Sequence, residues 1–240
     1  MKKRALSSGS PVPSPPSRVP LLVFDLDGTL IDGYAGIAAA LATAMERLGL
    51  PPLPAETVRG MVGHGIERLL EKAVGKERAL EGVRLFREAY PQVALEKTTL
   101  MPDVAEVLTE LGRRGYKMAV ASNKLATFSR QILESLGVGG FFFAVAGPDG
   151  ETPVKPDPTM LRRLMSEAGV EPGETVVVGD MEVDAELARA AGCRVVLVPG
   201  GSRTRNELAH VDADALLDRL ADLPAWLAQS APSPTGRGSG

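Results

Sequence analysis

Short apolar runs alternate with helical stretches along most of this chain, and this alternation constrains the fold more than any other feature. Five runs are apolar at nearly every position, which is typical of strands covered on both faces. They lie at residues 21–24, 117–121, 141–146, 175–178 and 194–198. Residues 103–114 and 184–191 have helical spacing and stop at Gly115 and Gly192. The order predicts an α/β fold, with a Rossmann-like, doubly wound parallel sheet as its core.

One interval departs from this alternation of strands and helices. Between residues 33 and 99 no run reads as a convincing strand, whereas residues 37–50, 57–74 and 78–90 each have helical periodicity. We therefore expect a core formed by residues 19–32 and 100–228. A small all-helical domain, residues 33–99, is inserted after the first strand and is expected to cover one end of the sheet.

The two ends of the chain differ in composition from the rest. Residues 1–18 and 229–240 are rich in Ser, Pro and Gly, and such segments cannot bury enough apolar surface to fold, so we expect both to be disordered. The first residues are basic, but they lack the apolar core of a secretory signal.

Composition limits the partners of the chain. Its 240 residues are 44% hydrophobic, which is enough for one large domain with an appendage, and its net charge of −3 argues against nucleic acid as a partner. No apolar run reaches the roughly 18 residues that a membrane span requires. Cys193 is the only cysteine, so an internal disulfide is impossible. These features predict a cytoplasmic protein with no membrane partner.

Polar side chains follow four of the five expected strands. Each has an ordinary structural explanation when taken alone, such as a turn, a helix N-cap or a solvated loop. Ligands in open α/β sheets bind beyond the carboxyl ends of the strands, and that is where these residues should meet. They are Asp25, Asp27, Ser122, Asn123, Lys155, Asp180 and Asp184.

This set of side chains suits phosphoryl chemistry. Four converging carboxylates would repel one another unless a hard divalent cation such as Mg²⁺ lay between them. Ser122 supplies a hydroxyl and Lys155 a positive charge for a phosphoryl group, which backbone N–H groups at helix starts can also bind. A central carboxylate is then a candidate nucleophile, and a second one two residues later is a candidate general acid and base.

Four sequence motifs together carry a family resemblance. DLDGT at residues 25–29, SNK at 122–124, KPDP at 155–158 and GDMEVD at 179–184 follow one another in this order. With them the chain resembles the haloacid dehalogenase-like (HAD) phosphatase superfamily over residues 21–228. The resemblance implies a Mg²⁺-dependent phosphatase that hydrolyses a small phosphorylated metabolite through an aspartyl-phosphate.

The resemblance also implies a role for each motif residue. Asp25 would be the nucleophile, and Asp27 would protonate the leaving oxygen and then activate water. Phosphate binding would fall to Ser122, Asn123, Lys155 and Thr29. The Mg²⁺ ligands would be Asp25, Asp27 through its backbone carbonyl, Asp180 and Asp184.

Within the superfamily, the insert is similar to a cap of the C1 type. The segments MVGHGIERLL, SNK and ARAAGC look closest to phosphoglycolate phosphatases, which makes 2-phosphoglycolate the leading substrate. Residues 63–65 would form a cap loop, with His64 facing the substrate. One position departs from the pattern: Met181 stands where these enzymes usually have Ser or Thr, which puts the geometry of the metal site in question.

Other functions remain open at this point. A phosphomutase similar to β-phosphoglucomutase would return the phosphoryl group to a sugar, although the Arg-rich cap pattern of such enzymes is missing. Inorganic pyrophosphate is a further possible substrate for the same fold. A non-catalytic binding module is the alternative from a different class, because a fold alone does not specify a function.

Overall fold

A parallel sheet forms the centre of the molecule. The structure, a computed structural model, describes residues 20–229, so the two expected tails lie outside the described residues except for Gln229. Within this range six strands pair in the order β5-β4-β1-β6-β7-β8, and every neighbouring pair is parallel. The strands are β1 (Leu21–Phe24), β4 (Lys117–Ala121), β5 (Ala144–Ala146), β6 (Thr175–Gly179), β7 (Arg194–Leu197) and β8 (Ala215–Leu216).

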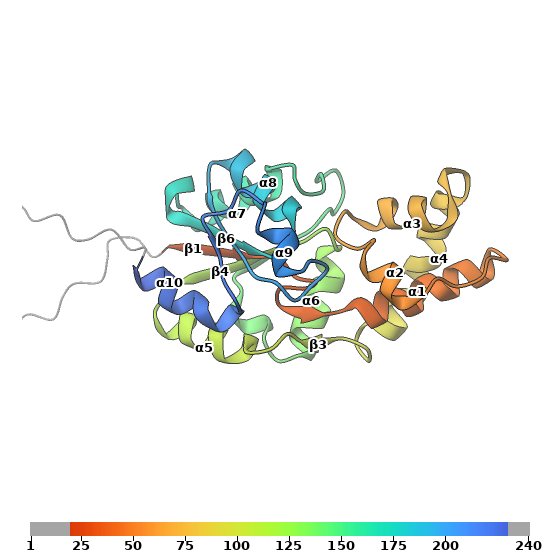
Figure 1. Cartoon of the computed structure of the whole chain (residues 1–240), viewed down its shortest axis with the longest axis horizontal. Helices are drawn as coiled ribbons and strands as arrows, with labels where there is room; N and C mark the ends of the chain where they lie inside the picture. The colour runs from red at the N-terminus through yellow and green to blue at the C-terminus, as the bar shows by residue number, and fades with distance from the viewer. Residues whose placement is uncertain (1–19, 230–240) are drawn as a thin grey trace, which may run out of the picture.

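Helices cover both faces of this sheet, which confirms the predicted doubly wound α/β fold. In β1, the alternate residues Leu22 and Phe24 pack with α5 and α10, whereas Leu21 and Val23 pack with α7 and α8. Figure 1 shows the first pair of helices below the sheet and the second above it. The helices are α5 (Val104–Arg113), α6 (Ala126–Ser135), α7 (Thr159–Ala168), α8 (Glu182–Ala191), α9 (Arg205–Leu208) and α10 (Leu223–Gln229).

One predicted strand is shorter than expected. Residues 141–146 were expected to be extended throughout, but only Ala144–Ala146 form β5, and Gly139–Phe141 form a 3₁₀ turn. The expectation of a strand at residues 141–143 is therefore wrong. The ring of Phe142 packs edge-on against Phe24, with 6.2 Å between ring centroids, while Phe143 is 42% exposed. The apolar run thus covers the end of the core as part of a turn.

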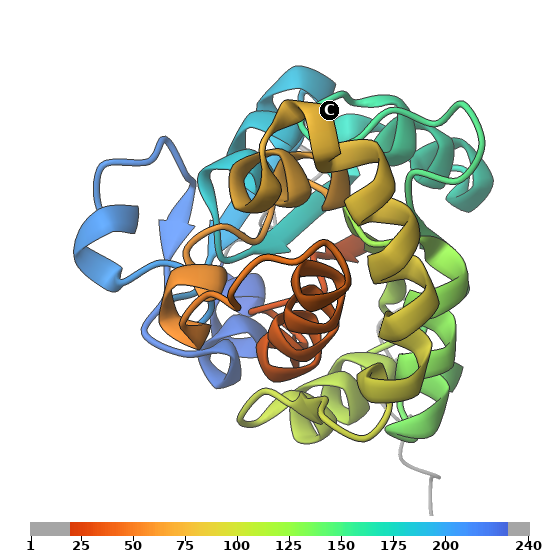
Figure 2. The ribbon, with the colours of Figure 1, turned by 90° about the vertical axis from the view of Figure 1, so that its right-hand side faces the viewer.

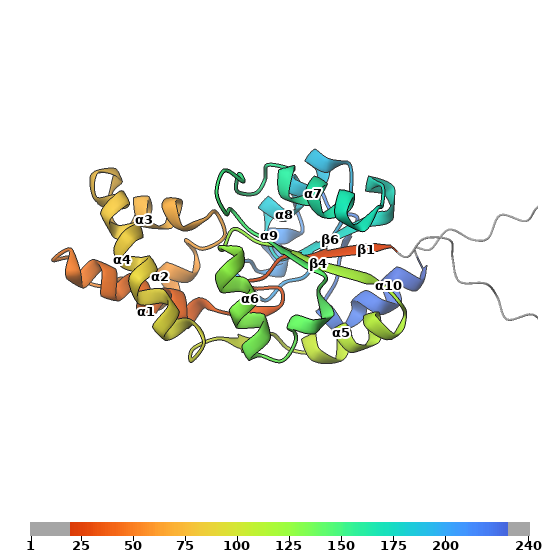
Figure 3. The same ribbon diagram turned by 180° about the vertical axis from the view of Figure 1, so that it is seen from behind.

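The interval after β1 is helical. It contains α1 (Tyr34–Arg47), α2 (Ala55–Arg59), α3 (Ile66–Val74) and α4 (Lys76–Ala94). The short strands β2 (Ile31–Asp32) and β3 (Thr99–Leu100) pair antiparallel where the chain leaves the core and returns to it. Figure 3 shows the four helices grouped at one end of the sheet, and Figure 2 shows them in front of the strand ends.

Glycines divide the segment of helical periodicity at residues 57–74 into two helices. Residues 57–74 form the end of α2, a loop and α3, because Gly63 has φ 118° and Gly65 has φ 88°. These left-handed conformations are available to glycine and end a helix. The loop at residues 60–65 is therefore free to approach the carboxyl ends of the strands. No helix among the described residues is long and apolar enough to cross a membrane.

Candidate active site

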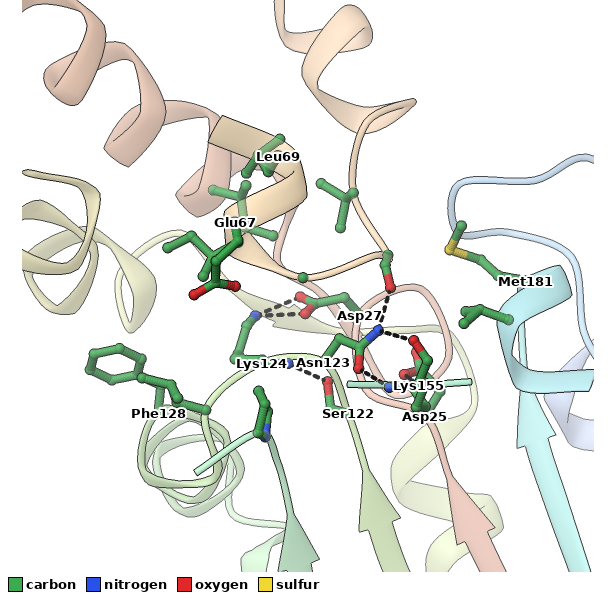
Figure 4. Close-up of a pocket in the computed structure, with 18 of the residues that line it drawn as sticks. Asp25, Asp27, Glu67, Leu69, Ser122, Asn123, Lys124, Phe128, Lys155 and Met181 are labelled. Carbon is green, nitrogen blue, oxygen red and sulfur yellow. Dashed lines mark hydrogen bonds and ion pairs between the residues drawn. The ribbon is translucent and has the colours of Figure 1, made fainter. Parts of the chain in front are cut away.

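The three central strands bring the predicted site residues together. β1 pairs with β4 on one side and with β6 on the other, so the residues after their carboxyl ends share one edge. Asp25 follows β1, Ser122 follows β4 and Asp180 follows β6. All three are buried, with at most 8% of each residue exposed. Figure 4 shows Asp25 and Ser122 facing the same pocket as Lys155.

Lys155 bridges two of the acids. Its Nζ atom lies 2.5 Å from Oδ1 of Asp25 and 2.7 Å from Oδ1 of Asp184. Burial alone would lower the pKa of this lysine, but the two carboxylates raise it above its usual value, so the amine stays charged. The structure therefore places a buried cation at the point where the sequence predicted a phosphoryl-binding lysine.

Asp180 lies against the backbone of two glycines. Its Oδ2 atom accepts a hydrogen bond from the Ser202 backbone N–H at 3.0 Å, and its Oδ1 atom is 3.5 Å from the Thr29 hydroxyl. A Cβ atom at Gly201 would lie 1.8 Å from Oδ2, and one at Gly28 would lie 2.4 Å from it. Glycine at both positions is what lets this carboxylate reach the strand edge.

The acids suit a divalent cation. Carboxylate oxygens of Asp25, Asp180 and Asp184 lie within 4.8 Å of one another, and all three residues are buried. With Lys155 these side chains carry a net charge of −2, which one divalent ion would balance. Burial and the neighbouring carboxylates raise the pKa of Asp180 well above its usual value, and burial raises the pKa of Asp184 to about 6 although Lys155 opposes this. A set of hard oxygen donors is the type that Mg²⁺ prefers.

Met181 leaves the acidic loop intact. Oδ2 of Asp184 accepts hydrogen bonds from the backbone N–H groups of Asp180 and Met181, each at 3.2 Å. The loop is thus held by backbone donors and needs no hydroxyl at position 181. The Met181 side chain instead packs against Gly63, where a Cβ atom would lie 2.3 Å from the Met181 sulfur.

Asp27 has a separate partner. Its two carboxylate oxygens lie 2.7 and 2.8 Å from Nζ of Lys124, and both side chains are largely buried. Burial raises the pKa of Asp27 even though Lys124 opposes the shift. The Asp27 side chain is therefore ion-paired with Lys124 and is not part of the cluster formed by the other three acids. Its backbone carbonyl accepts a hydrogen bond from the Tyr34 hydroxyl at 3.4 Å.

Asn123 ties the helical insertion to the core. Its side-chain amide donates to the carbonyl of Gly63 at 2.9 Å and to the carbonyl of Lys155 at 3.3 Å. Its Oδ1 atom accepts from the Lys155 backbone N–H at 2.7 Å. One side chain therefore fixes both the backbone that carries the lysine and the loop after α2.

A cavity of about 120 Å³ lies between the insertion and the strand ends. Its floor is polar and includes Asp25, Asp27, Ser122 and Lys155. Its walls come from both parts of the chain and are mostly apolar; among them are Val62, Ile66, Leu69, Phe86, Leu125 and Phe128. A small anionic group on the floor would thus have an apolar cover.

Two predicted contact residues lie outside this cavity. His64 is exposed and lines a neighbouring cavity with Glu182 and Arg203. Thr29 is buried behind Asp180 and lies near its carboxylate. Neither residue lines the space above Asp25 in the described structure.

Several site residues had no assigned role in the sequence pattern. Lys124 belongs to the SNK motif, but only the structure shows its pairing with Asp27. Tyr34 and Ser202 are 168 positions apart, and their hydroxyl oxygens lie 3.0 Å from each other beside Asp27 and Asp180. No local spacing could have indicated this contact, because it depends on how the loop after β7 meets the start of α1.

The family of the chain follows from a direct comparison. The family model described as "Haloacid dehalogenase-like hydrolase" matches residues 22–198, which include all four motifs. The chain belongs to this family. The match confirms the resemblance seen in the motifs and covers most of the described residues.

Two relatives and one solved structure within the family share a description as phosphoglycolate phosphatases, known or predicted. The chain is 35% identical to the phosphoglycolate phosphatase of Aquifex aeolicus over 85% of this chain and 94% of that one. It is 33% identical to the phosphoglycolate phosphatase of Vibrio parahaemolyticus, covering 89% and 98% of the two chains. A crystal structure of a predicted phosphoglycolate phosphatase from Haemophilus somnus superposes with a TM-score of 0.81 at 27% identity, covering 87% and 98%.

Proposed function

We propose that the chain is a Mg²⁺-dependent phosphatase of small phosphomonoesters, with 2-phosphoglycolate as its leading substrate. The observation that carries the proposal is the convergence of Asp25, Asp180 and Asp184, two of which, Asp25 and Asp184, pair with the buried Lys155 amine. The names of the Aquifex and Vibrio relatives support the choice of substrate. The cavity supports a short substrate, because its volume of about 120 Å³ is below the roughly 300–1,000 Å³ of typical small-molecule sites.

The chemistry would proceed in two steps. An oxygen of Asp25 attacks phosphorus, the bond from phosphorus to the leaving oxygen breaks, and Asp27 gives that oxygen a proton. Water then attacks the phosphorus of the aspartyl-phosphate, Asp27 takes a proton from the water, and inorganic phosphate leaves while Asp25 is regenerated. Each P–O bond that forms is matched by one that breaks, and the protons balance with water as the only added reactant.

The remaining groups would bind and orient the substrate. Lys155 and the Ser122 hydroxyl neutralise and hold the phosphoryl oxygens, while Asn123 keeps the Lys155 backbone in place. Asp25, Asp180, Asp184 and the Asp27 carbonyl would hold Mg²⁺, which supplies positive charge for the phosphoryl group. The helices α1–α4 would act as a cap that excludes water from the cavity.

A phosphate-release assay with matched variants tests the proposal. Wild-type protein should release phosphate from 2-phosphoglycolate with Mg²⁺ and lose this activity in EDTA. Asp25→Asn should reduce the rate to background, because an amide cannot act as the nucleophile. The control is Asp222→Asn, at an exposed carboxylate paired with Arg219, which should leave the rate unchanged. Equal rates for Asp25→Asn and the wild type would contradict the assignment, and a rearranged sugar phosphate in place of free phosphate would indicate a mutase.

A further inference from the structure

A buried tyrosine hydroxyl belongs to a residue at the wall of the cavity and makes no well-formed hydrogen bond. Tyr90 on α4 is 2% exposed and lines the cavity. Among residues 20–229 its hydroxyl oxygen makes no hydrogen bond of normal geometry. The Lys124 amine lies close enough to lower the pKa of this phenol, although burial dominates and raises it. A buried hydroxyl without a partner costs free energy, and native proteins rarely keep one without a reason. This hydroxyl is therefore a candidate for contact with a ligand.

The Tyr90 ring is held in place by two other rings. It stacks on Phe86, with 5.2 Å between centroids, and meets Phe128 edge-on at 5.5 Å. Phe86 belongs to the insertion and Phe128 to α6 of the core, so the hydroxyl is positioned where the two parts meet. Because the ring is already fixed, its hydroxyl could bind a ligand with little further loss of side-chain entropy.

A second donor lies beside it. Nζ of Lys124 is 5.2 Å from the centre of the Tyr90 ring and contacts both carboxylate oxygens of Asp27. An ammonium has three N–H donors, and one carboxylate does not use all of them. Asp27 is the proposed proton donor to the leaving oxygen, so the Lys124 amine and the Tyr90 hydroxyl border the space where the leaving group would lie.

The rest of that space is apolar or already paired. Leu69, Phe86 and Phe128 form its walls. The charged residues Glu67 and Arg87 at its exposed side are paired with each other at 3.0 Å. Arg87 keeps further N–H donors, but its side chain is 44% exposed to water. A hydrogen-bond acceptor on the leaving group would therefore find its buried donors at Tyr90 and Lys124.

We propose that Tyr90, together with Lys124, is the subsite that selects a short leaving group carrying an oxygen acceptor close to the ester carbon, such as a carboxylate. This inference rests on the proposed phosphatase function and adds the residue that would set its specificity. A leaving group of the same length without the acceptor would leave the buried hydroxyl unpaired and would be cleaved less well.

The test compares two substrates that differ in that acceptor. 2-Phosphoglycolate and ethyl phosphate both have two-carbon leaving groups, and the second lacks the carboxylate. The wild type should favour 2-phosphoglycolate in kcat/KM, and Tyr90→Phe should reduce this preference about tenfold or more by losing a charge-assisted hydrogen bond. The rate with ethyl phosphate should change little. Tyr116→Phe, which removes a phenol hydroxyl outside the cavity, is the matched control.

Two further measurements separate specificity from damage to the fold. The melting temperature of Tyr90→Phe should equal or exceed that of the wild type, because the substitution removes an unpaired buried hydroxyl. In the Asp25→Asn background, calorimetry with Mg²⁺ should show weaker binding of 2-phosphoglycolate after Tyr90→Phe, without any need for turnover.

The outcomes distinguish the two proposals. If the wild type hydrolyses no phosphomonoester, the proposed function fails, and unchanged calorimetric binding after Tyr90→Phe would overturn the subsite as well. If the wild type is an active phosphatase but Tyr90→Phe keeps the full preference for 2-phosphoglycolate, the subsite is wrong and the function stands.

Discussion

At the scale of single residues, Gly28 and Gly201 leave the space that the Asp180 carboxylate occupies. A Cβ atom at Gly201 would lie 1.8 Å from the Asp180 carboxylate, closer than any non-bonded contact allows. The carboxylate is buried and bound to the Ser202 backbone, so it cannot move aside without losing that hydrogen bond. A single methyl group at this position should therefore displace an acid that we propose as a metal ligand.

We predict that Gly201→Ala lowers kcat by about 100-fold, because a displacement of about 1 Å can cost this much in rate. The variant should also require more Mg²⁺ for half-maximal activity. The matched control is Gly173→Ala, where the added Cβ would meet no described atom within 4 Å apart from its own local backbone and chain neighbours. Steady-state kinetics over a Mg²⁺ titration measures both effects. Wild-type values for Gly201→Ala would show that Asp180 does not need its present position.

The sequence predicts part of this site for a clear reason. Residues that follow parallel strands must meet at one edge of the sheet, so Asp25, Ser122 and Asp180 could be placed together before any coordinates. The pairing of Lys124 with Asp27 and the orphaned hydroxyl of Tyr90 could not be predicted in this way. The first depends on side-chain conformations in two loops of the core, after β1 and after β4. The second depends on the angle at which α4 of the insertion meets the core, and a period of 3.6 residues carries no information about that angle.

At the scale of elements, α5 shows how burial supports the sheet. Leu111 is fully buried between α5 and the core, whereas Leu80 on α4 is 86% exposed. Leu111→Ala should lower the free energy of unfolding by about 2–5 kcal/mol, because it removes buried methyl groups and leaves a cavity. Leu80→Ala should change it by less than about 0.5 kcal/mol. Urea denaturation of both variants measures the difference, and similar losses would contradict the burial described.

Element boundaries were less predictable than element types. The helical periodicity of residues 57–74 is real on both sides of the break, but Gly63 and Gly65 adopt left-handed conformations that no apolar spacing reveals. The run at residues 141–143 is apolar in the same way as a buried strand, yet it packs as a turn beside Phe24. An apolar run therefore predicts neither the backbone conformation nor full burial, because Phe143 is 42% exposed.

At the scale of the whole molecule, the insertion and the core meet at few polar contacts. Arg59 on α2 donates to the carbonyls of Gly200 and Gly201, each at 3.2 Å, and its guanidinium lies 4.3 Å from the centre of the Tyr34 ring. The Asn123 amide and the Met181 side chain hold Gly63 from the other side. The cover over Asp25 thus rests on the loop after β4, the loop after β6 and the loop after β7.

Membership of the family accounts for the sheet and for the order of the motifs. Three segments spread over about 160 positions place three acids and one lysine within a single buried cluster. In the proposed mechanism, one of these acids carries the phosphoryl group during turnover. We propose Asp25 for this role because it faces the cavity together with Ser122 and Lys155.

The most direct test is to trap the phosphorylated enzyme. Wild-type protein turning over radiolabelled substrate with Mg²⁺ would be quenched in acid, digested, and its labelled peptide identified by mass spectrometry. The account predicts label on the peptide that contains Asp25, with none in the Asp25→Asn variant. Phosphate release without any labelled protein, or label that persists in Asp25→Asn, would contradict it.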